Sequence, residues 1–462
     1  MDLLPGGKLF PTGPENFRDW HNLDPGSLAP VLAEQARQGS GLLTVITPDS
    51  LSAQQLLDSL EFYLGDTDLP RLLFPDWETL PYDLFSPHQD IVSDRVRALH
   101  RLPRLDQGIL ITPVNTLLQR LAPRAHIQGN TFLLRVGEAF DMEATREQLA
   151  ISGYQQRENV REHGEYAVRG AIMDIFPMGA EQPFRVELFD EDIESLRLFD
   201  PESQLSTDKV DTITLLPAAE YPLGQEAIRR FRSAFRERFD VDPRQCPLYQ
   251  DVSEGIAAPG LEYYLPLFFN ELATLFDYLP DDTALVQLAG LNQAREQFQA
   301  EVQERHESRG HDIRRPILDP GELFLREDEF NARLKERPRA RLVDEAHHQA
   351  VSFGFAAAPD LAADPRQDPG FSKLRAFLEE YPDHRVLICA ETAGRREALL
   401  ESLQKHGIQP ELLDGWADFR DHGPGVTLTV GALDQGFWHP DSRTLVIAES
   451  QLHGERIPQR RR

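Results

Sequence analysis

Two arginines and a phenylalanine in the middle of the chain have the chemistry needed to recognise another protein. Arg169, Arg185 and Phe189 lie near the ends of expected strands, beside acidic residues. An exposed aromatic side chain next to arginines is the composition of a protein-binding hot spot. The alternative is that Phe189 packs into the core and that the arginines belong to an ordinary solvated face, since most surface charges bind nothing specific.

A second candidate is Asp344-Glu345-Ala346-His347, which spells the DEAH motif of a helicase magnesium site. A working motif of this kind ends a buried apolar strand and faces a phosphate-binding loop. Here only Leu342 and Val343 precede the motif, after the polar run 335–341. We therefore expect no such strand and interpret the four letters as a chance match.

The strands that must position the two arginines are expected in residues 153–199. Apolar and polar residues alternate through 166–176 and 184–198, with Gly, Pro and short polar gaps between the runs. This period-two pattern indicates antiparallel strands joined by turns. One face of such a sheet is buried and the other is solvated. The pattern therefore predicts a compact β-rich module.

The charge balance argues against a primary nucleic-acid surface. The chain has 462 residues, with 48 Lys and Arg against 76 Asp and Glu, and a net charge of −28. Phosphates would be repelled at long range, and no basic patch stands out before the final IPQRRR. The length indicates about three or four domains.

Cysteine usage and hydropathy narrow the class further. Cys246 and Cys389 are far apart and show no metal-ligand spacing, so we expect two core residues and no metal site. No apolar run approaches the ~20 residues that span a bilayer, and the first residues lack the pattern of a signal peptide. We expect a cytoplasmic protein with no membrane partner.

Two long stretches carry a family resemblance. EHGEYAVRGAIMDIFP, at 162–177, and FRVELFDEDIESLRLFD, at 184–200, resemble the module by which bacterial transcription-repair coupling factors and UvrB dock UvrA. PDWETLPYDLFSPHQDIVSDRVRAL, at 75–99, is also similar to the coupling factors. The resemblance implies UvrA as the partner, and it implies that three matching residues make the contact: Arg169, Arg185 and Phe189.

The resemblance also locates where a nucleotide would bind. In UvrB and the helicases, a lysine in the first lobe reaches the β- and γ-phosphates. The corresponding residues 22–29 retain Gly26-Ser27 but have no lysine, and Asp24 would repel a triphosphate. The strand expected at 283–289 ends without the carboxylates that hold magnesium. The resemblance thus implies a degenerate nucleotide fold with no catalytic residue, no ATP and no magnesium.

The predicted fold is α/β. A degenerate helicase-like (RecA-type) lobe contains the inserted β-rich UvrA-binding module, and a second small α/β domain follows. Within the lobe we expect a strand at 42–47 and a helix at 53–63 with Ser52 as its N-cap. The predicted boundaries are 1–123 and 214–349 for the lobe, 124–213 for the module, 350–369 for a linker, 370–455 for the small domain and 456–462 for the start of a further linker.

The resemblance implies a role in DNA repair. The chain would be the UvrA-recruiting N-terminal part of a protein at least about twice as long, which releases RNA polymerase stalled at a lesion by ATP-driven translocation on double-stranded DNA. Absent domains would bind the polymerase and the DNA, and a C-terminal domain would cover the docking face. Two alternatives stay open: an active ATP-dependent helicase core that uses Asp344 and Glu345, and a purely structural or autoinhibitory arm.

Overall fold

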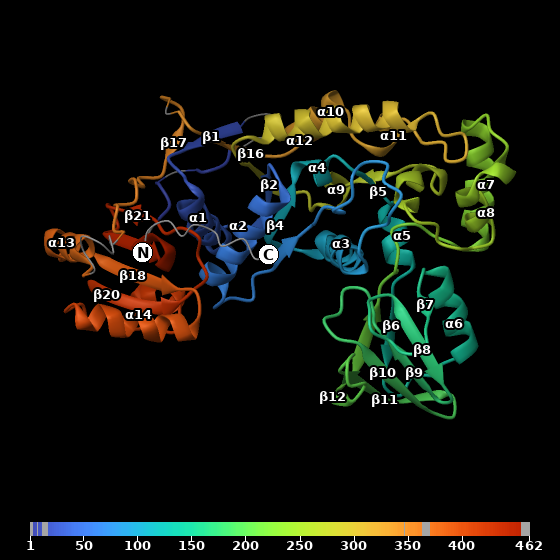
Figure 1. The fold of residues 1–462 in the computed structure, drawn as a ribbon, viewed down its shortest axis with the longest axis horizontal. Helices are drawn as coiled ribbons and strands as arrows, with labels where there is room; N and C mark the ends of the chain where they lie inside the picture. The colour runs from blue at the N-terminus through green and yellow to red at the C-terminus, as the bar shows by residue number, and fades with distance from the viewer. Residues whose placement is uncertain (1–2, 7, 12–16, 346, 363–369, 454–462) are drawn as a thin grey trace.

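The computed structural model describes residues 3–6, 8–11, 17–345, 347–362 and 370–453. Over these residues the chain forms three larger sheets with helices packed on them (Figure 1). None of the described helices is both long and apolar enough to cross a membrane. The basic run IPQRRR and the predicted segment 456–462 lie outside the described residues.

The first sheet is entirely parallel and has seven strands. The inner strand β2 is one of the two longest in this sheet and is buried at every position, as expected when helices cover both faces of a parallel sheet. Residues on both sides of the inserted module contribute to this sheet. The strand order is β17 (Val351–Ser352), β1 (Phe17–His21), β16 (Arg339–Val343), β15 (Ala284–Gln287), β2 (Gly41–Thr47), β4 (Gln107–Pro113) and β3 (Arg71–Leu73).

Helices from separate parts of the chain cover the two faces of this sheet. On one face lie α1 (Pro25–Gln38) and α2 (Ser50–Leu64). On the other face lie α3 (Gln89–Arg101), α4 (Val114–Leu117), α10 (Leu291–Arg309) and α12 (Glu327–Lys335). The expected strand at 42–47 and the helix that follows it are confirmed, with the helix beginning three residues earlier than expected.

The start of α2 corrects the predicted N-cap. Asp49, not Ser52, caps the helix, and its side chain accepts a hydrogen bond from the backbone N–H of Ser52. Asp49 has the extended backbone that an N-cap requires. Ser52 is already inside the first helical turn, so its hydroxyl is not needed there.

The second sheet contains the strands predicted from the alternating pattern, which confirms the β-rich module. It is antiparallel except for one edge pair, β7 and β8. Its order is β12 (Ser206–Val210), β11 (Asp192–Phe199), β10 (Phe184–Phe189), β9 (Ile172–Ile175), β8 (Glu165–Arg169) and β7 (Gln155–Gln156). The module also contains α6 (Met142–Ile151) and the pair β6 (Phe132–Arg135) and β13 (Thr212–Leu215). In Figure 1 it projects from the seven-stranded lobe.

A third group of elements packs around an aromatic cluster beyond the parallel sheet. Its main helices are α7 (Gln225–Arg238) and α8 (Pro247–Ser253), at the far end of the molecule in Figure 1. Shorter elements complete this region and its junctions: η1 (Leu102–Arg104), β5 (Arg120–Leu121), α5 (Arg124–Gly129), η2 (Pro243–Gln245), η3 (Leu261–Leu267), β14 (Ala273–Thr274), α9 (Leu275–Tyr278) and α11 (Pro320–Leu323).

The last sheet has five strands and lies against α1 and α2. Its order is β19 (Glu411–Leu412), β20 (Gly425–Val430), β18 (Arg385–Ala390), β22 (Thr444–Ala448) and β21 (Trp438–His439), and only β21 runs antiparallel. Four helices accompany it: α13 (Ser372–Glu380), α14 (Ala393–Lys405), α15 (Trp416–Asp421) and α16 (Glu449–His453).

The predicted linker 350–369 is corrected in its first part. Two of its residues form the edge strand β17, and Phe353 and Phe355 are buried in a core shared by the parallel lobe and the five-stranded sheet. The Ala/Asp/Pro composition of 356–369 indicated a linker, but these apolar residues precede it and pack. Residues 363–369 lie outside the described residues.

Candidate functional site

The face of the six-stranded sheet that carries Arg169 and Arg185 is polar. Side chains alternate between the two faces of a strand, and cross-strand pairs share a face. The register aligns Ala167 with Asp174, Asp174 with Arg185, and Arg185 with Arg197. The opposite face is buried against α6 and α3, through residues that include Leu149. This face therefore carries a charged row in which Arg185 and Arg197 are partly exposed and Asp174 is buried.

A buried carboxylate joins the two predicted arginines. Asp174 is 2% exposed, and its oxygens lie 2.7 and 2.9 Å from Nε and Nη2 of Arg185. The same carboxylate lies 3.8 Å from Nη1 of Arg169. Hydrogen bonding to Asp174 raises the pKa of the Arg185 guanidinium above its usual value. The bidentate pair fixes the plane of Arg185, and Asp174 is shared between both arginines.

The two guanidinium groups differ in how much of each remains available. The Arg185 side chain is 16% exposed and lies over the ring of Phe199, 5.2 Å from its centroid. The Arg169 side chain is 48% exposed, and its Nη2 donates to the backbone carbonyl of Glu158 at 2.6 Å. Arg169 thus presents the larger open donor surface, while Arg185 is the more rigidly oriented.

Phe189 is exposed, so the alternative in which it packs into the core is wrong. Its side chain is 68% accessible. It ends β10, directly before the turn at Asp190, whose φ of 53° is left-handed. Four residues along a strand cover roughly 13 Å, so Phe189 stands well beyond Arg185 on the same face. The structure brings the two arginines together and leaves the phenylalanine at the hairpin end.

Sequence reasoning missed Asp174 and Arg197. Asp174 lies within an otherwise apolar strand, and a lone carboxylate in such a run is the signal that a partner is needed. Arg197 is paired in register with Arg185, and its Nε lies 3.5 Å from Glu187. Both residues enlarge the polar row, which we call the docking face: Arg169, Asp174, Arg185, Glu187, Phe189 and Arg197.

The second candidate site lies at the N-terminus of α1. The Asp24 side chain accepts a hydrogen bond from the N–H of Ser27 at 2.8 Å, and the Ser27 hydroxyl accepts one from the N–H of Asp24 at 2.8 Å. This capping box uses donors that a phosphate would need. A Cβ on Gly26 would lie 2.1 Å from the carbonyl oxygen of Gly436, so backbone from the second α/β region closes over this helix end.

The DEAH residues lie nearer to this helix end than the sequence indicated. The structure forms β16 directly before Asp344, parallel to and beside β1, although the preceding polar run argued against a strand. Asp344 lines a hollow of about 390 Å³ with Pro25, Leu288 and Asp434. Ala346 lies outside the described residues. His347 Nε2 is 2.9 Å from Asp19 Oδ2, so this histidine is engaged with a neighbouring strand.

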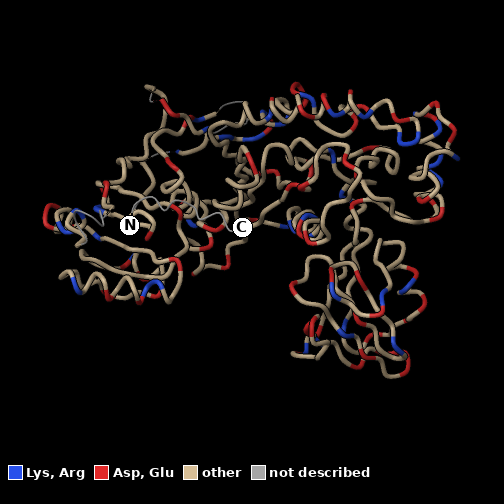
Figure 2. The backbone as a smooth tube through the Cα atoms, in the orientation of Figure 1, with Lys and Arg blue, Asp and Glu red and all other residues tan. Residues whose placement is uncertain are grey.

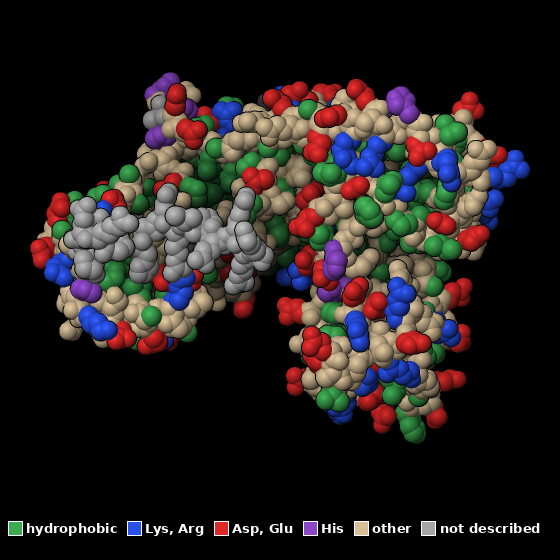
Figure 3. Space-filling model, in the orientation of Figure 1, with side chains coloured by type: hydrophobic (Ala, Val, Ile, Leu, Met, Phe, Trp, Pro, Cys, Tyr) green, Lys and Arg blue, Asp and Glu red, His purple; other side chains and the backbone are tan. Residues whose placement is uncertain are grey.

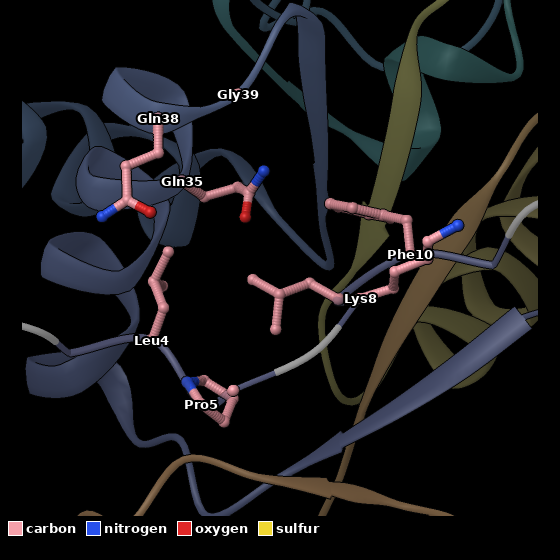
Figure 4. A pocket seen from close by; sticks show the side chains of 9 residues that line it. Leu4, Pro5, Lys8, Phe10, Gln35, Gln38 and Gly39 are labelled. Atoms are coloured by element: carbon pink, nitrogen blue, oxygen red, sulfur yellow. The ribbon is translucent and has the colours of Figure 1, made fainter.

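No metal-binding cluster of three or more His, Cys, Asp or Glu side chains occurs in the described part of the chain. Cys246 and Cys389 are both free and buried. A further hollow of about 500 Å³ lies between the N-terminal segment and the end of α1. Figure 4 shows Gln35 and Gln38 at this hollow, opposite the segment with Leu4 and Pro5. It contains no group of ionisable side chains that would bind or catalyse.

Two domain families match parts of the chain. Residues 132–221 match the UvrB interaction domain, and this range includes the whole docking face. Residues 377–452 match the D3 domain of MFD, and this range includes the five-stranded sheet. The predicted module at 124–213 and the predicted small domain at 370–455 overlap these matches, while the exact boundaries stay predictions.

Full-length relatives extend the similarity along the chain. The chain is 42% identical over 437 residues to the transcription-repair-coupling factor of Escherichia coli. The aligned region covers 94% of this chain and 38% of the relative. The chain is 40% identical over 460 residues to that of Haemophilus influenzae, covering 98% of this chain and 39% of the relative. The chain spans about two fifths of the length of these relatives. It is thus similar, along nearly its whole length, to the N-terminal part of the transcription-repair-coupling factors, Mfd.

Proposed function

We propose that this chain recruits UvrA through the docking face. The observation that carries the proposal is the geometry of the face within the UvrB interaction domain: two arginines joined by a buried carboxylate and a phenylalanine that is 68% exposed. Arginines pair well with carboxylates of a partner, and an exposed aromatic side chain supplies the apolar anchor. The proposed activity is the recognition of a protein and not catalysis.

The role of the whole protein follows by similarity. We propose that it releases RNA polymerase stalled at DNA lesions and brings in excision repair, with the polymerase and double-stranded DNA bound outside this chain. A C-terminal domain that covers the docking face until translocation begins would make recruitment conditional.

The seven-stranded lobe is proposed to be a degenerate, helicase-like nucleotide fold that binds neither ATP nor magnesium. The capping box of Asp24 and Ser27, and the contact of Gly436 with Gly26, both support this proposal. The rival is an active helicase core, which the position of Asp344 beside the helix end favours. Magnesium-dependent ATP binding by the chain would exclude our proposal for this lobe.

The docking face is tested by calorimetric titration of the chain with its cognate UvrA. Phe189→Ala should weaken binding by about 30-fold, the size of a hot spot of 2 kcal/mol, without changing the melting temperature. The matched control is Phe85→Ala, because Phe85 is 69% exposed but lies outside the module. The control should bind UvrA as the parent does.

A triple variant with Arg169→Ala, Arg185→Ala and Phe189→Ala separates the possible outcomes. Loss of binding with retained folding supports both the role and the site. Equal binding by parent and variant would show that these residues do not contact UvrA, while the recruitment of UvrA by the chain would still be supported. Absence of binding by the parent would favour a structural or autoinhibitory arm.

A further inference from the structure

Helix α7 carries arginines that the proposed function does not use. Its sequence QEAIRRFRSAFRER contains five arginines and two glutamates, in a chain whose net charge is −28. The arginines are interleaved with apolar and acidic residues, so the sequence shows no basic run. Figure 2 shows basic residues at the end of the molecule where α7 lies, and basic side chains gather on the surface there in Figure 3.

Three of these arginines share one flank of the helix. Arg229, Arg232 and Arg236 are related by steps of three and four residues, which place side chains in one row. The helix packs through a neighbouring row of buried residues: Ile228, Phe231 and Phe235. We call Arg229, Arg232 and Arg236 the arginine stripe. Seven residues of helix extend about 10 Å, so the stripe is a short line of three positive charges.

No carboxylate in the described part of the chain neutralises the arginine stripe. Arg232 Nε donates to the Tyr249 hydroxyl at 3.3 Å, and the Arg236 guanidinium lies 5.5 Å from the Tyr249 ring centroid. Arg229 Nε donates to the Gln225 backbone carbonyl at 3.3 Å. None of the three forms an ion pair with a carboxylate among the described residues, in contrast to Arg238, which pairs with Glu322 at 2.9 Å.

The chemistry of the stripe fits phosphate better than a protein surface. Guanidinium groups bind phosphate and carboxylate oxygens alike in a bidentate way, so the surrounding surface decides between DNA and a protein. Protein interfaces instead need apolar anchors at their centre, and no large exposed hydrophobic side chain lies on α7. The neighbouring α8 also lines a hollow of about 350 Å³ that contains Arg244 and Arg314. Arg244 is paired with Asp242 at 3.1 Å, whereas Arg314 forms no ion pair among the described residues.

We propose that the arginine stripe binds the phosphate backbone of double-stranded DNA, without reading its sequence. Contacts to the backbone position a protein but carry no base information. The net charge of −28 repels DNA at long range, so we expect weak binding, and the phosphate contacts make that binding strongly dependent on salt. Three phosphate contacts give a log–log salt slope of about −2.7, which is about a sixfold loss of affinity for each doubling of salt.

Fluorescence anisotropy with a labelled duplex at low ionic strength tests this proposal. The variant carries Arg229→Gln, Arg232→Gln and Arg236→Gln. The control carries Arg135→Gln, Arg146→Gln and Arg396→Gln, which remove the same charge from exposed or partly exposed ion pairs elsewhere. The parent and the control should bind with the steep salt dependence, and the stripe variant should lose binding and most of the slope.

Other results overturn the proposal. Equal duplex binding by the stripe variant and the parent would show that the arginines do not contact DNA. If the parent does not bind the duplex at low salt, the proposal is also wrong. Loss of binding to an acidic protein by the stripe variant would not change that conclusion. Tighter binding to a single strand of the same sequence than to the duplex would reject the assignment to double-stranded DNA. Unchanged melting temperatures show that every variant is folded.

Discussion

Asp174 connects the two arginines of the docking face. It is 2% exposed and contacts both arginines, at 2.7 Å for Arg185 and 3.8 Å for Arg169. Removing one partner of a buried ion pair leaves the other charge without compensation. The orientation of both arginines thus depends on a carboxylate that is almost entirely shielded from solvent.

Asp174→Asn should destabilise the module by about 3 kcal/mol, because the guanidinium of Arg185 stays partly buried without its counter-charge. Urea unfolding measures the free energy, and titration with UvrA should show weaker binding by the folded variant. The control is Asp208→Asn on the exposed edge strand β12, which should change neither property. An unchanged unfolding free energy for Asp174→Asn would mean that the arginines are held by other contacts.

Glu262 is a buried carboxylate in η3, far from the docking face. Burial raises the pKa of Glu262 from its usual 4.5 to about 7, and the nearby Glu220 acts in the same direction. The Ser86 hydroxyl donates to its Oε2 at 2.9 Å. The folded state therefore holds a proton that the unfolded chain releases near pH 4.5.

This difference in pKa gives stability a defined pH dependence. Between about pH 4.5 and 7 the folded chain binds more protons at Glu262, so its contribution to stability falls as pH rises and the full penalty is present above 7. Glu262→Gln should remove this pH dependence and raise the free energy of unfolding by about 3 kcal/mol at pH 8. Urea unfolding at several pH values, beside the exposed Glu254→Gln, measures it. An unaltered slope in Glu262→Gln would assign the pH dependence to other groups.

At the scale of elements, sequence patterns predicted what depends on local periodicity. The strands around Arg169 and Arg185 follow the period-two alternation, and β2 lies at the strand expected over 42–47. The strand β16 was missed because its arginines interrupt the apolar run. Arg339 is nevertheless 8% exposed, and its Nη1 donates to the Leu334 carbonyl, a partner that the sequence cannot reveal.

The N-terminus of α1 provides a test of how elements fit together. Gly26 is helical, but a Cβ there would meet the Gly436 carbonyl oxygen at 2.1 Å. Gly26→Ala should therefore cost about 2 kcal/mol by overpacking, despite the higher helix propensity of alanine. Gly394→Ala in α14 meets nothing within 4 Å and should be neutral or stabilising. Thermal unfolding compares the two variants. Equal melting temperatures would show that the backbone at Gly436 moves away from Gly26 without cost.

At the scale of the whole molecule, the residues of the proposed docking face were easier to single out from the sequence than the packing between regions. Arg169, Arg185 and Phe189 came from a local pattern and a family resemblance, whereas Asp174 needed the cross-strand register. Neither the local pattern nor the family resemblance predicted the core that the parallel lobe shares with the five-stranded sheet. Its contacts join residues more than 300 positions apart, and no local periodicity encodes which distant aromatic side chains will meet.

The shared core predicts that the parallel lobe and the five-stranded sheet unfold together. Trp416 of α15 is 5% exposed and packs edge-on against Tyr63 of α2, with ring centroids 4.8 Å apart. Arg420 adds an ion pair to Glu34 at 3.4 Å. Because the buried ring links the two regions, Trp416→Ala should cost about 4 kcal/mol and split one calorimetric transition into two.

Phe377→Ala is the matched control for this split. Phe377 is 6% exposed, but it lies in the other core of the five-stranded sheet, away from α2. Its removal should lower the stability of that sheet by a similar amount while leaving the contact between the regions intact. A single transition in the Trp416→Ala variant would mean that the two regions are coupled by the remaining contacts, with Phe353 and Phe355 as the next residues to truncate.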